Sequence, residues 1–276
     1  MTDRDWGETL YAGSAPYYAR GRLPYAPELA EALGDELELG GTGRLLDVGC
    51  GPGSLAVVLA PLFAAVVGID ADAAMVAEAD RLGIPNARFV RLRAEELPAG
   101  LGTFRVATFA QSFHWMDRPR VAAAVRDLLE PGGALVHLSA TTHRGVGGDE
   151  GLPGPQPPRE EIDALVGSYL GPVRRAGRAA IPGGTASGED EILAAAGFGG
   201  PRRLEVGGGR VFERSEDEVV ASVFSLSSAA PHLFGERLDE FELELRELLR
   251  RASPEGRFAE RAREVGVSIW RPRPAA

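Results

Sequence analysis

Short apolar runs alternate with helical patterns from Arg44 to Ser139, and this alternation limits the possible folds more than any other feature of the sequence. Apolar runs typical of buried strands lie at 44–48, 65–70, 87–92, 104–110 and 134–139. Helical patterns lie between them at 54–63, 72–82 and 118–129. Strands and helices that alternate at this pitch form right-handed βαβ units and a parallel sheet with both faces covered. The sequence therefore predicts a doubly wound, mostly parallel α/β sheet.

Single residues predict where several of these elements begin and end. Ser54 and Asp72 stand at helix starts, where a side-chain oxygen can accept hydrogen bonds from free backbone N–H groups. Gly83 is expected to close the second helix, and 131–133 to turn the chain into the fifth strand. A further helix is expected earlier in the chain, at 28–39.

The C-terminal half is expected to add helical insertions and two strands, which gives a seven-stranded sheet. Segment 143–160 is rich in Gly and Pro and too polar to bury, so it is either a mobile lid or a disordered loop. Ser215 and Glu218 have the spacing of a capping box at the start of a helix. The expected helices lie at 187–198, 215–226 and 234–251, and the expected strands at 201–206 and 265–270.

Composition excludes several classes of protein. The net charge of −10 and the absence of a basic stripe argue against a nucleic-acid partner. The single cysteine, Cys50, excludes an internal disulfide and a cysteine-based zinc site, and no metal is expected. No run approaches the ~20 apolar residues of a membrane span, and the first residues lack the apolar core of a signal peptide. We expect a cytoplasmic protein without a membrane partner.

The segment LLDVGCGPG at Leu45–Gly53 joins the first strand to a helix. Its glycines allow a sharp turn and a close approach of the backbone to a ligand, and Asp70 ends the next strand, where an acid can bind ribose hydroxyls. The same letters fit the loose dinucleotide fingerprint, with Gly51, Gly53 and Ala56 in its three positions. Asp47 decides between the two interpretations, because a carboxylate there suits a positively charged amine and repels pyrophosphate.

The chain resembles the class I S-adenosylmethionine-dependent methyltransferases, with a domain like methyltransferase types 11 and 25. The segments that carry this resemblance follow one another in the family's order, at 45–53, 67–70, 94–98, 109–115 and 129–133. A looser match at Tyr17, Tyr18 and 22–25 is similar to the branch that contains trans-aconitate methyltransferase. The resemblance implies S-adenosylmethionine as cofactor. It also implies an N-terminal helical cap segment at 1–43, a cofactor-binding core at 44–140, and a C-terminal part of the same domain at 141–276 with lid and substrate-binding insertions.

The resemblance also assigns cofactor-binding residues by position. The methionine and ribose portions would lie against Asp47, Gly49, Gly51 and Gly53. Asp70 would hold the ribose hydroxyls, and Gln111 would face the sulfonium. The adenine would lie beside Ala71, Ala94 and Glu95. Arg93 departs from the family, which commonly has an acid there, and an arginine cannot accept a hydrogen bond from the adenine amino group.

Residues for the acceptor side are expected at both ends of the chain. His114, after the fourth strand, is a candidate general base near neutral pH, or else it shapes the pocket. Trp115 is expected to stack on a ligand or to cap the core. The other candidates are Tyr17, Tyr18, Arg22, His143 and His232. Arg22 would suit an acceptor that carries a carboxylate.

Three functions are compatible with these patterns. The first is methyl transfer from S-adenosylmethionine to a small-molecule acceptor, such as a carboxylate or a secondary metabolite, by a monomer or homodimer. The second is a catalytically inactive methyltransferase-like fold that binds or regulates. The third is an NAD-dependent oxidoreductase, which the charge of Asp47 disfavours.

Overall fold

The computed structural model describes residues 10–148, 151–173, 175–176, 179–180 and 188–274. It divides the chain into two compact units, each built from separate stretches of sequence. The sheet unit comprises Tyr25–Ala140, Ala186–Gly207 and Glu264–Ala276, and the helical unit comprises Met1–Pro24, Thr141–Thr185 and Gly208–Arg263. The boundaries predicted at residues 43 and 140 separate segments by their expected function and not by their packing. They therefore stay a prediction.

The sheet unit is built on seven strands of the described chain, in the order β3-β2-β1-β4-β5-β11-β8. They are β1 (Arg44–Val48), β2 (Ala65–Asp70), β3 (Ala87–Arg91), β4 (Phe104–Ala110), β5 (Leu129–Ser139), β8 (Phe198–Val206) and β11 (Val265–Pro272). The first five pair in parallel, and β11 is antiparallel to both of its neighbours. This confirms the predicted doubly wound, mostly parallel sheet.

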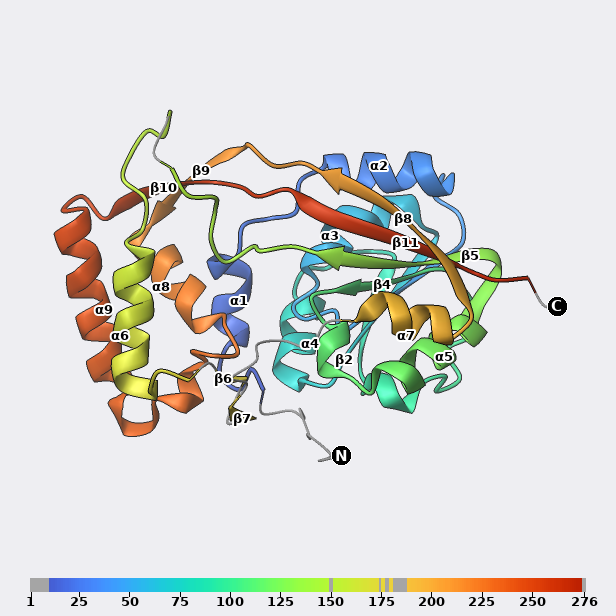
Figure 1. Cartoon of the computed structure of the whole chain (residues 1–276), viewed down its shortest axis with the longest axis horizontal. Helices are drawn as coiled ribbons and strands as arrows, with labels where there is room; N and C mark the ends of the chain where they lie inside the picture. Colours follow the sequence, from blue (N-terminus) through green and yellow to red (C-terminus); the bar gives the residue numbers. More distant parts are fainter. Residues whose placement is uncertain (1–9, 149–150, 174, 177–178, 181–187, 275–276) are drawn as a thin grey trace. The chain divides into compact units, whose positions relative to one another are not determined.

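Helices cover both faces of this sheet (Figure 1). Leucines of α2 (Glu28–Leu37) and α3 (Ser54–Leu59) pack with one set of strand residues, such as Leu45 and Val136. The opposite set, such as Leu46 and Phe109, packs with α5 (Arg118–Leu128) and α7 (Glu189–Ala195). A fifth helix, α4 (Ala73–Asp80), contacts β2 and β3. The inner strands β1, β2 and β4 therefore bury both of their faces, as their apolar runs predict, whereas β3 and β8 at the two edges keep exposed residues.

The predicted strand and helix bounds of this unit agree with the structure to within a few residues, with three corrections. Ser54 does not cap α3: Gly53 is the N-cap, and no side-chain hydrogen bond caps the helix. The helix expected at 28–39 ends at Leu37 because Glu38 adopts a left-handed conformation with φ of 53°. Residues 131–133 are not a separate turn but an irregularity within β5, where the pairing with β4 shifts in register.

The described residues of the sheet unit also form three short 3-10 helices: η1 (Ala60–Leu62), η2 (Ala94–Glu96) and η3 (Phe113–Trp115). The first continues α3, so the helix predicted at 54–63 changes type at Ala60, one residue before Pro61. The Asp72 cap is confirmed, since its carboxylate accepts hydrogen bonds from the backbone N–H groups of Ala74 and Met75.

The described residues of the helical unit form four α-helices and two hairpins, and the helices pack around an aromatic core. The helices are α1 (Ala15–Gly21), α6 (Arg159–Leu170), α8 (Glu216–Phe224) and α9 (Leu238–Ala252), with the 3-10 helices η4 (Pro231–Leu233) and η5 (Gly235–Arg237). The hairpins pair β9 (Val211–Ser215) with β10 (Arg257–Arg261), and β6 (Arg175–Ala176) with β7 (Ala179–Ala180). The rings of Phe224, Phe234 and Phe241 lie against one another at its centre. A Cβ on Gly21 of α1 would lie 2.3 Å from the carbonyl oxygen of Ala221, so this glycine permits close packing of α1 on α8.

Sequence patterns were less informative for this unit. The capping box of Ser215 and Glu218 is confirmed, with both of its hydrogen bonds present. The helix expected from 234 begins only at Leu238, because Gly235 has a positive φ of 57° and the turn before it is a 3-10 helix. The segment expected as a connector at 143–160 ends in the first residues of α6.

Hydrogen bonds and a β-bridge hold the described part of that connector. The side chain of Gln156 donates hydrogen bonds to the carbonyl oxygens of Val146 and Gly148, and Val146 forms a β-bridge with Arg261. In the described parts of the chain, no helix combines the length and apolar character needed to cross a membrane.

Candidate active site

The glycine loop after β1 follows the carboxyl end of the middle one of the five parallel strands. Gly49, Gly51 and Gly53 all have positive φ, at 70°, 54° and 81°. The backbone N–H groups of Gly49 and Cys50 both donate to the carbonyl oxygen of Ile69, which holds the loop against the end of β2. Three left-handed residues in five are uncommon in an ordinary turn, and here only glycine takes them without strain.

The three glycines serve two different purposes. A Cβ on Gly49 would lie 2.5 Å from the Cβ of Ser112, and one on Gly53 would lie 2.8 Å from a methyl carbon of Leu82. Packing against Ser112 therefore requires glycine at position 49, whereas at position 53 glycine is favoured mainly by the positive φ. A Cβ on Gly51 would meet nothing within 4 Å. The open backbone at Gly51 is the part of the loop that a ligand can approach.

Asp47 is a buried carboxylate, and only one of its two oxygens accepts a hydrogen bond from a described residue. It is 1% exposed, and its Oδ1 accepts a hydrogen bond of 2.7 Å from the Thr108 hydroxyl. Its other oxygen, Oδ2, has no hydrogen-bond partner among the described residues. Burial raises the pKa of Asp47 to about 7, against the lowering effect of the Thr108 hydrogen bond, and the charge of Asp70 raises it further. This carboxyl group therefore titrates near neutral pH.

Asp70 ends β2 beside the same loop. Its two oxygens accept hydrogen bonds of 2.9 Å from the backbone N–H groups of Gly51 and Asp72. Burial raises the pKa of Asp70, and these two hydrogen bonds oppose that rise. Each carboxylate oxygen can accept a second hydrogen bond, so the group is fixed in place and still able to bind hydroxyls.

The end of β4 supplies residues that sequence patterns did not identify. Thr108 of β4 lies opposite Asp47 of β1 in the pairing of the two strands. This strand pairing is the signal by which Thr108 could have been identified. Ser112 is buried and donates a hydrogen bond of 2.6 Å to the carbonyl oxygen of Val48. Gln111, between them, has a positive φ of 58°. Such a conformation is strained for a residue with a side chain and is typical of functional sites.

The residues predicted around the adenine follow β2 and β3. Ala71 follows Asp70 and is half-buried, and Ala94 is buried in η2. The carboxylate of Glu95 accepts a hydrogen bond of 2.9 Å from the backbone N–H of Asp117 and lies 3.7 Å from the Arg93 guanidinium. Glu95 therefore neutralises Arg93 and holds the start of α5, and its remaining lone pairs are available to a ligand.

His114 and Trp115 lie together in η3. Their rings meet edge to face with centroids 4.4 Å apart. The backbone N–H of Trp115 donates to the carbonyl oxygen of Ser112, which links η3 to the end of β4. The structure thus groups His114, Gln111 and the glycine loop at the carboxyl ends of neighbouring parallel strands, the usual ligand-binding edge of such a sheet.

The remaining predicted acceptor residues belong to the helical unit. Tyr17 packs on Phe224 with ring centroids 5.0 Å apart, and Arg22 lies over the ring of Tyr18 at 4.4 Å. The Arg22 guanidinium also donates to the hydroxyl and carbonyl oxygens of Ser225, at 2.8 and 2.7 Å. These contacts hold Arg22 at the carboxyl end of α8.

The two histidines predicted in the helical unit lie on different segments. The Nδ1 of His232 is 2.9 Å from the carbonyl oxygen of Ala12. Within the described chain its buried Nε2 has no hydrogen-bond partner. The carbonyl oxygen of His143 accepts a hydrogen bond from Arg159. In the part of the chain that the structure describes, no cluster of three His, Cys, Asp or Glu side chains is placed to hold a metal ion.

The central part of the chain is similar to known methyltransferases. Residues 45–133 match the family described as a methyltransferase domain. Trans-aconitate 2-methyltransferase of Deinococcus radiodurans is 37% identical over 103 residues, which cover 36% of this chain and 39% of that protein. An uncharacterized methyltransferase of Mycobacterium tuberculosis is 33% identical over 118 residues, which cover 43% of this chain and 46% of that protein. The similarity thus spans less than half the length of these relatives.

Solved structures resemble the fold over most of the chain. A protein described as a type II methyltransferase from Anaeromyxobacter dehalogenans has a TM-score of 0.52 at 20% identity, covering 91% of this chain and 97% of its own. The [4+2]-cyclase SpnF has a TM-score of 0.51 at 18% identity, covering 96% of this chain and 95% of its own. At these identities the likeness concerns the fold, which can host more than one reaction.

Proposed function

From the match of residues 45–133 to a methyltransferase domain, we propose that the protein binds S-adenosylmethionine and transfers its methyl group to a small-molecule acceptor. One observation carries the proposal. A buried carboxylate, Asp47, keeps one oxygen without a partner among the described residues, directly before a loop whose middle glycine is open. A buried acid of this kind is costly unless a ligand supplies the missing donor.

The residues of the loop fit the parts of this cofactor. The unpartnered oxygen of Asp47 suits the ammonium group of the methionine portion. The open backbone at Gly51 admits the ligand, and Asp70 can accept hydrogen bonds from the ribose hydroxyls. Ala71, Ala94 and Glu95 would line the adenine.

The same features disfavour NAD as the cofactor. The pyrophosphate of a dinucleotide would have to lie at the glycine loop, where the ionised form of Asp47 would repel it. A ligand with an amine has the opposite preference, because its positive charge stabilises the ionised carboxylate.

When bound, the cofactor supplies an electrophilic methyl group, and the protein has to orient the acceptor in line with it and exclude water. Gln111, held in a strained conformation at the end of β4, would fix the sulfonium side of the site. A general base is needed only for an acceptor that must lose a proton, and His114 is the candidate.

Kinetics separate the two roles of His114. If it acts as a base, His114→Gln lowers kcat by about 100-fold or more and abolishes the dependence of kcat on pH. If it shapes the pocket, the same variant raises the KM of the acceptor and leaves the pH profile of kcat intact.

A carboxylate on the acceptor is supported by Arg22. In the described chain this guanidinium has no acidic partner and is anchored by Ser225 and Tyr18. For an acceptor identified by screening carboxylic acids, we expect Arg22→Gln to raise KM by about tenfold, the loss of a charge-assisted hydrogen bond. Arg20→Gln, an exposed arginine of the same helix, is the matched control. An unchanged KM in Arg22→Gln would remove the carboxylate from the proposal.

Calorimetric titration tests the cofactor. We expect S-adenosylmethionine and S-adenosylhomocysteine to bind with a stoichiometry of one, and NAD not to bind. Binding of NAD alone would overturn the proposal. Binding of both adenosyl ligands without turnover of any acceptor in a broad panel would favour an inactive binding or regulatory protein, and the fold of the cyclase SpnF is a reason to use such a panel.

A further inference from the structure

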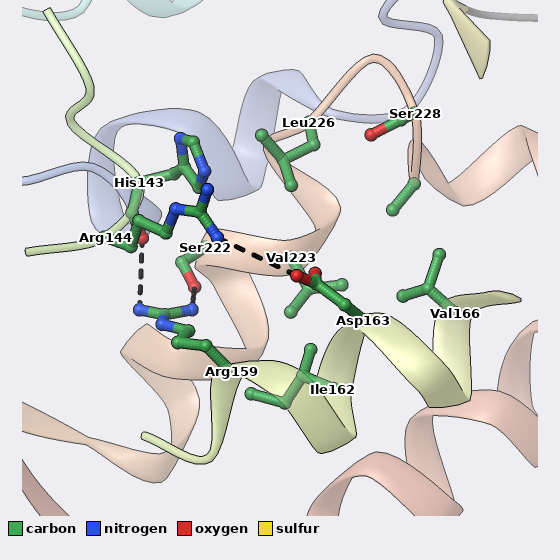
Figure 2. Close-up of a pocket in the computed structure, with 11 residues that line it drawn as sticks. His143, Arg144, Arg159, Ile162, Asp163, Val166, Ser222, Val223, Leu226 and Ser228 are labelled. Carbon is green, nitrogen blue, oxygen red and sulfur yellow. Dashed lines mark hydrogen bonds and ion pairs between the residues drawn. The ribbon is translucent and has the colours of Figure 1, made fainter. Parts of the chain in front are cut away.

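The hollow between the start of α6 and the end of α8 is lined by side chains of the helical unit that bind one another (Figure 2). Figure 2 shows the Arg159 guanidinium turned to the Ser222 hydroxyl, 3.0 Å away, and Arg144 turned to Asp163. The cavity volume is about 50 Å³, which admits a few water molecules and no substrate. Packing therefore explains these polar groups. A residue that packing does not explain lies in the sheet unit, at the end of β4.

Gln111 follows β4 in a backbone conformation that a side chain disfavours. Its φ of 58° lies in the left-handed region, where a Cβ crowds the following carbonyl oxygen. Two other described residues besides the glycines have a positive φ, Glu38 at 53° and Ala99 at 45°. Glu38 is the C-cap of α2, and left-handed residues are common at such helix ends. Gln111 stands instead at the ligand-binding edge of the sheet, where strain of this kind is typical of function.

The next residue, Ser112, holds Gln111 in this conformation. The buried hydroxyl of Ser112 donates a hydrogen bond of 2.6 Å to the carbonyl oxygen of Val48, the last residue of β1. A Cβ on Gly49 would lie 2.5 Å from the Cβ of Ser112, so Ser112 and the glycine loop are in close contact. On the other side, the backbone N–H of Gln111 donates to the carbonyl oxygen of Leu138 in β5, at 3.3 Å. The end of β4 is therefore tied to both neighbouring strands, and Gln111 cannot relax without breaking one of these bonds.

The side-chain amide of Gln111 is available to a ligand. The residue is half-buried, and within the described chain no hydrogen bond uses its amide. The glycine loop follows β1, which pairs directly with β4, so the loop and Gln111 share one edge of the sheet. An amide offers a carbonyl oxygen with a partial negative charge. This oxygen attracts a positively charged sulfur and has little attraction for a neutral one.

We propose that Gln111 distinguishes the charged sulfur of S-adenosylmethionine from the neutral sulfur of S-adenosylhomocysteine, and that Ser112 is the positioning residue that holds Gln111 for this contact. This role rests on the proposed function, in which the adenosyl ligand lies at the glycine loop. In methyl transfer the electrons of the broken S–C bond stay on sulfur, which loses its positive charge as the acceptor gains the methyl group. The contact with Gln111 therefore weakens when transfer is complete, and it favours binding of the substrate over retention of the product.

Isothermal titration of the full chain with both adenosyl ligands tests the role of Gln111. Gln111→Gly removes the amide, and glycine adopts the left-handed conformation without strain, so we expect an unchanged or higher melting temperature. Affinity for S-adenosylmethionine should fall about tenfold, the size of one contact with a charged group, and affinity for S-adenosylhomocysteine by less than about threefold. Glu38→Gly is the matched control, since Glu38 has the same backbone conformation at an exposed position, and both affinities should stay unchanged. An equal loss of affinity for the two ligands in Gln111→Gly would overturn the role of Gln111.

The same titrations test Ser112 as a positioning residue. Ser112→Ala should weaken S-adenosylmethionine binding about fivefold, the worth of one hydrogen bond, with little effect on S-adenosylhomocysteine. Added to Gln111→Gly, the same change should alter neither affinity, because a positioning residue acts only through the residue that it holds. Ser14→Ala is the matched control, since the buried Ser14 hydroxyl donates a hydrogen bond of 2.7 Å to the carbonyl oxygen of Phe224 in the helical unit. That variant should lower the melting temperature and leave both affinities unchanged.

The outcomes separate the two residues from each other and from the proposed function. Thermal unfolding confirms that each variant is folded, and Gln111→Gly tests the discrimination even if Ser112→Ala does not fold. An equal effect of Ser112→Ala with and without Gln111 would make Ser112 a structural residue and overturn its positioning role. The same ratio of the two affinities in the wild type, Gln111→Gly and Ser112→Ala would overturn the discrimination and leave the proposed function standing. Binding of neither ligand to the wild type would overturn the proposed function and this role with it.

Discussion

Each unit of the molecule buries an acid, and the two acids are treated in opposite ways. Glu260 of the helical unit is 3% exposed and accepts hydrogen bonds from two guanidinium groups and from the backbone N–H of Gly145. Asp47 of the sheet unit is 1% exposed and accepts one hydrogen bond, from a neutral hydroxyl. The helical unit surrounds its acid with positive charge, and the sheet unit leaves its acid without any among the described residues.

The difference separates a structural role from a binding role. A buried ion pair is costly to break, because the remaining charge loses its partner and cannot be hydrated. A buried acid without a counter-charge is already unfavourable, and only a ligand that brings the missing charge relieves it. The four predictions below test this contrast, from the largest expected effect to the smallest.

Removal of the paired acid should destabilise the protein most. Glu260→Ala leaves Arg159 and Arg214 buried next to each other without their carboxylate. We expect the free energy of unfolding to fall by about 3–5 kcal/mol, measured by urea denaturation followed by circular dichroism. Glu213→Ala breaks an exposed ion pair with Arg257 instead, 3.7 Å long, and should cost less than about 1 kcal/mol. Equal losses in the two variants would mean that the buried network is not structural.

Removal of the unpaired acid should have the opposite effect on stability. Asp47→Asn takes away a charge that burial disfavours, so at pH 8 we expect unchanged or higher thermal stability. The same change should weaken S-adenosylmethionine binding by about 100-fold, since a buried charge contact is lost. Asp72→Asn is the matched control, because asparagine caps a helix as well as aspartate does. A destabilised Asp47→Asn that keeps full affinity would contradict the proposed role of Asp47.

The pKa of Asp47 predicts how affinity depends on pH. In the free protein the pKa is about 7, above its ordinary value of 3.8, and a bound ammonium group should lower it. Affinity for S-adenosylmethionine should therefore rise as pH increases from 6 to 8, and fall by up to about tenfold for each pH unit below 7. Stability without ligand should change in the opposite direction. The neutral form of Asp47 is favoured in the folded state, so its contribution is present below about pH 4 and is lost as pH rises through 7.

Calorimetry between pH 5.5 and 8.5 measures the first effect, and thermal unfolding over the same range measures the second. Asp47→Asn should flatten both profiles relative to wild type. A profile that keeps its full slope in Asp47→Asn would assign the titration to another group, such as Asp70.

The smallest effect is expected for Thr108. Its hydroxyl donates to Asp47 and lowers the pKa of that carboxyl group. Thr108→Val keeps the shape and loses the hydrogen bond, so the pH midpoint for cofactor binding should rise and affinity at pH 7 should fall by about fivefold, the worth of one hydrogen bond. Thr108→Ser restores a hydroxyl and should restore the wild-type midpoint. An unchanged midpoint in Thr108→Val would show that the hydrogen bond does not tune Asp47.

The same contrast explains how much could be predicted from sequence. In the sheet unit, strands buried on both faces appear as continuous apolar runs, so β1, β2 and β4 have the predicted bounds. The glycine loop and Asp70 were identified because their spacing lies within one βαβ unit. Thr108 was missed because its role depends on strand register, which places it opposite Asp47 from 61 residues away.

The helical unit could be predicted only in part, because its buried polar residues look like surface residues in the sequence. Arg214 and Glu260 each stand next to another charged residue, Glu213 in β9 and Arg261 in β10, and the two form an ion pair across 46 positions of sequence. The prolines before Arg159 are typical of a loop, so the start of α6 at this residue was not predicted. The Arg159 side chain pairs with Glu260 and so belongs to the same buried ionic network. The positions of Tyr17, Tyr18, Arg22 and His232 follow from long-range packing in this unit, which no local pattern encodes.

The place of β11 also has a consequence for the order in which the protein can form during synthesis. β11 lies between β5 and β8 in the sheet, but the chain reaches it at Val265, long after β8 ends at Val206. A ribosome releases the chain from its N-terminus, so β8 emerges before the strand that joins it to the sheet exists. The five parallel strands can assemble first. β8 cannot pair with the sheet until the segment Gly208–Arg263 and then β11 have been made. Arg202, Arg203 and Glu205 of β8 are exposed. Their charges suit a strand that is unpaired during synthesis, because charged side chains on a free strand edge hinder its pairing with another chain.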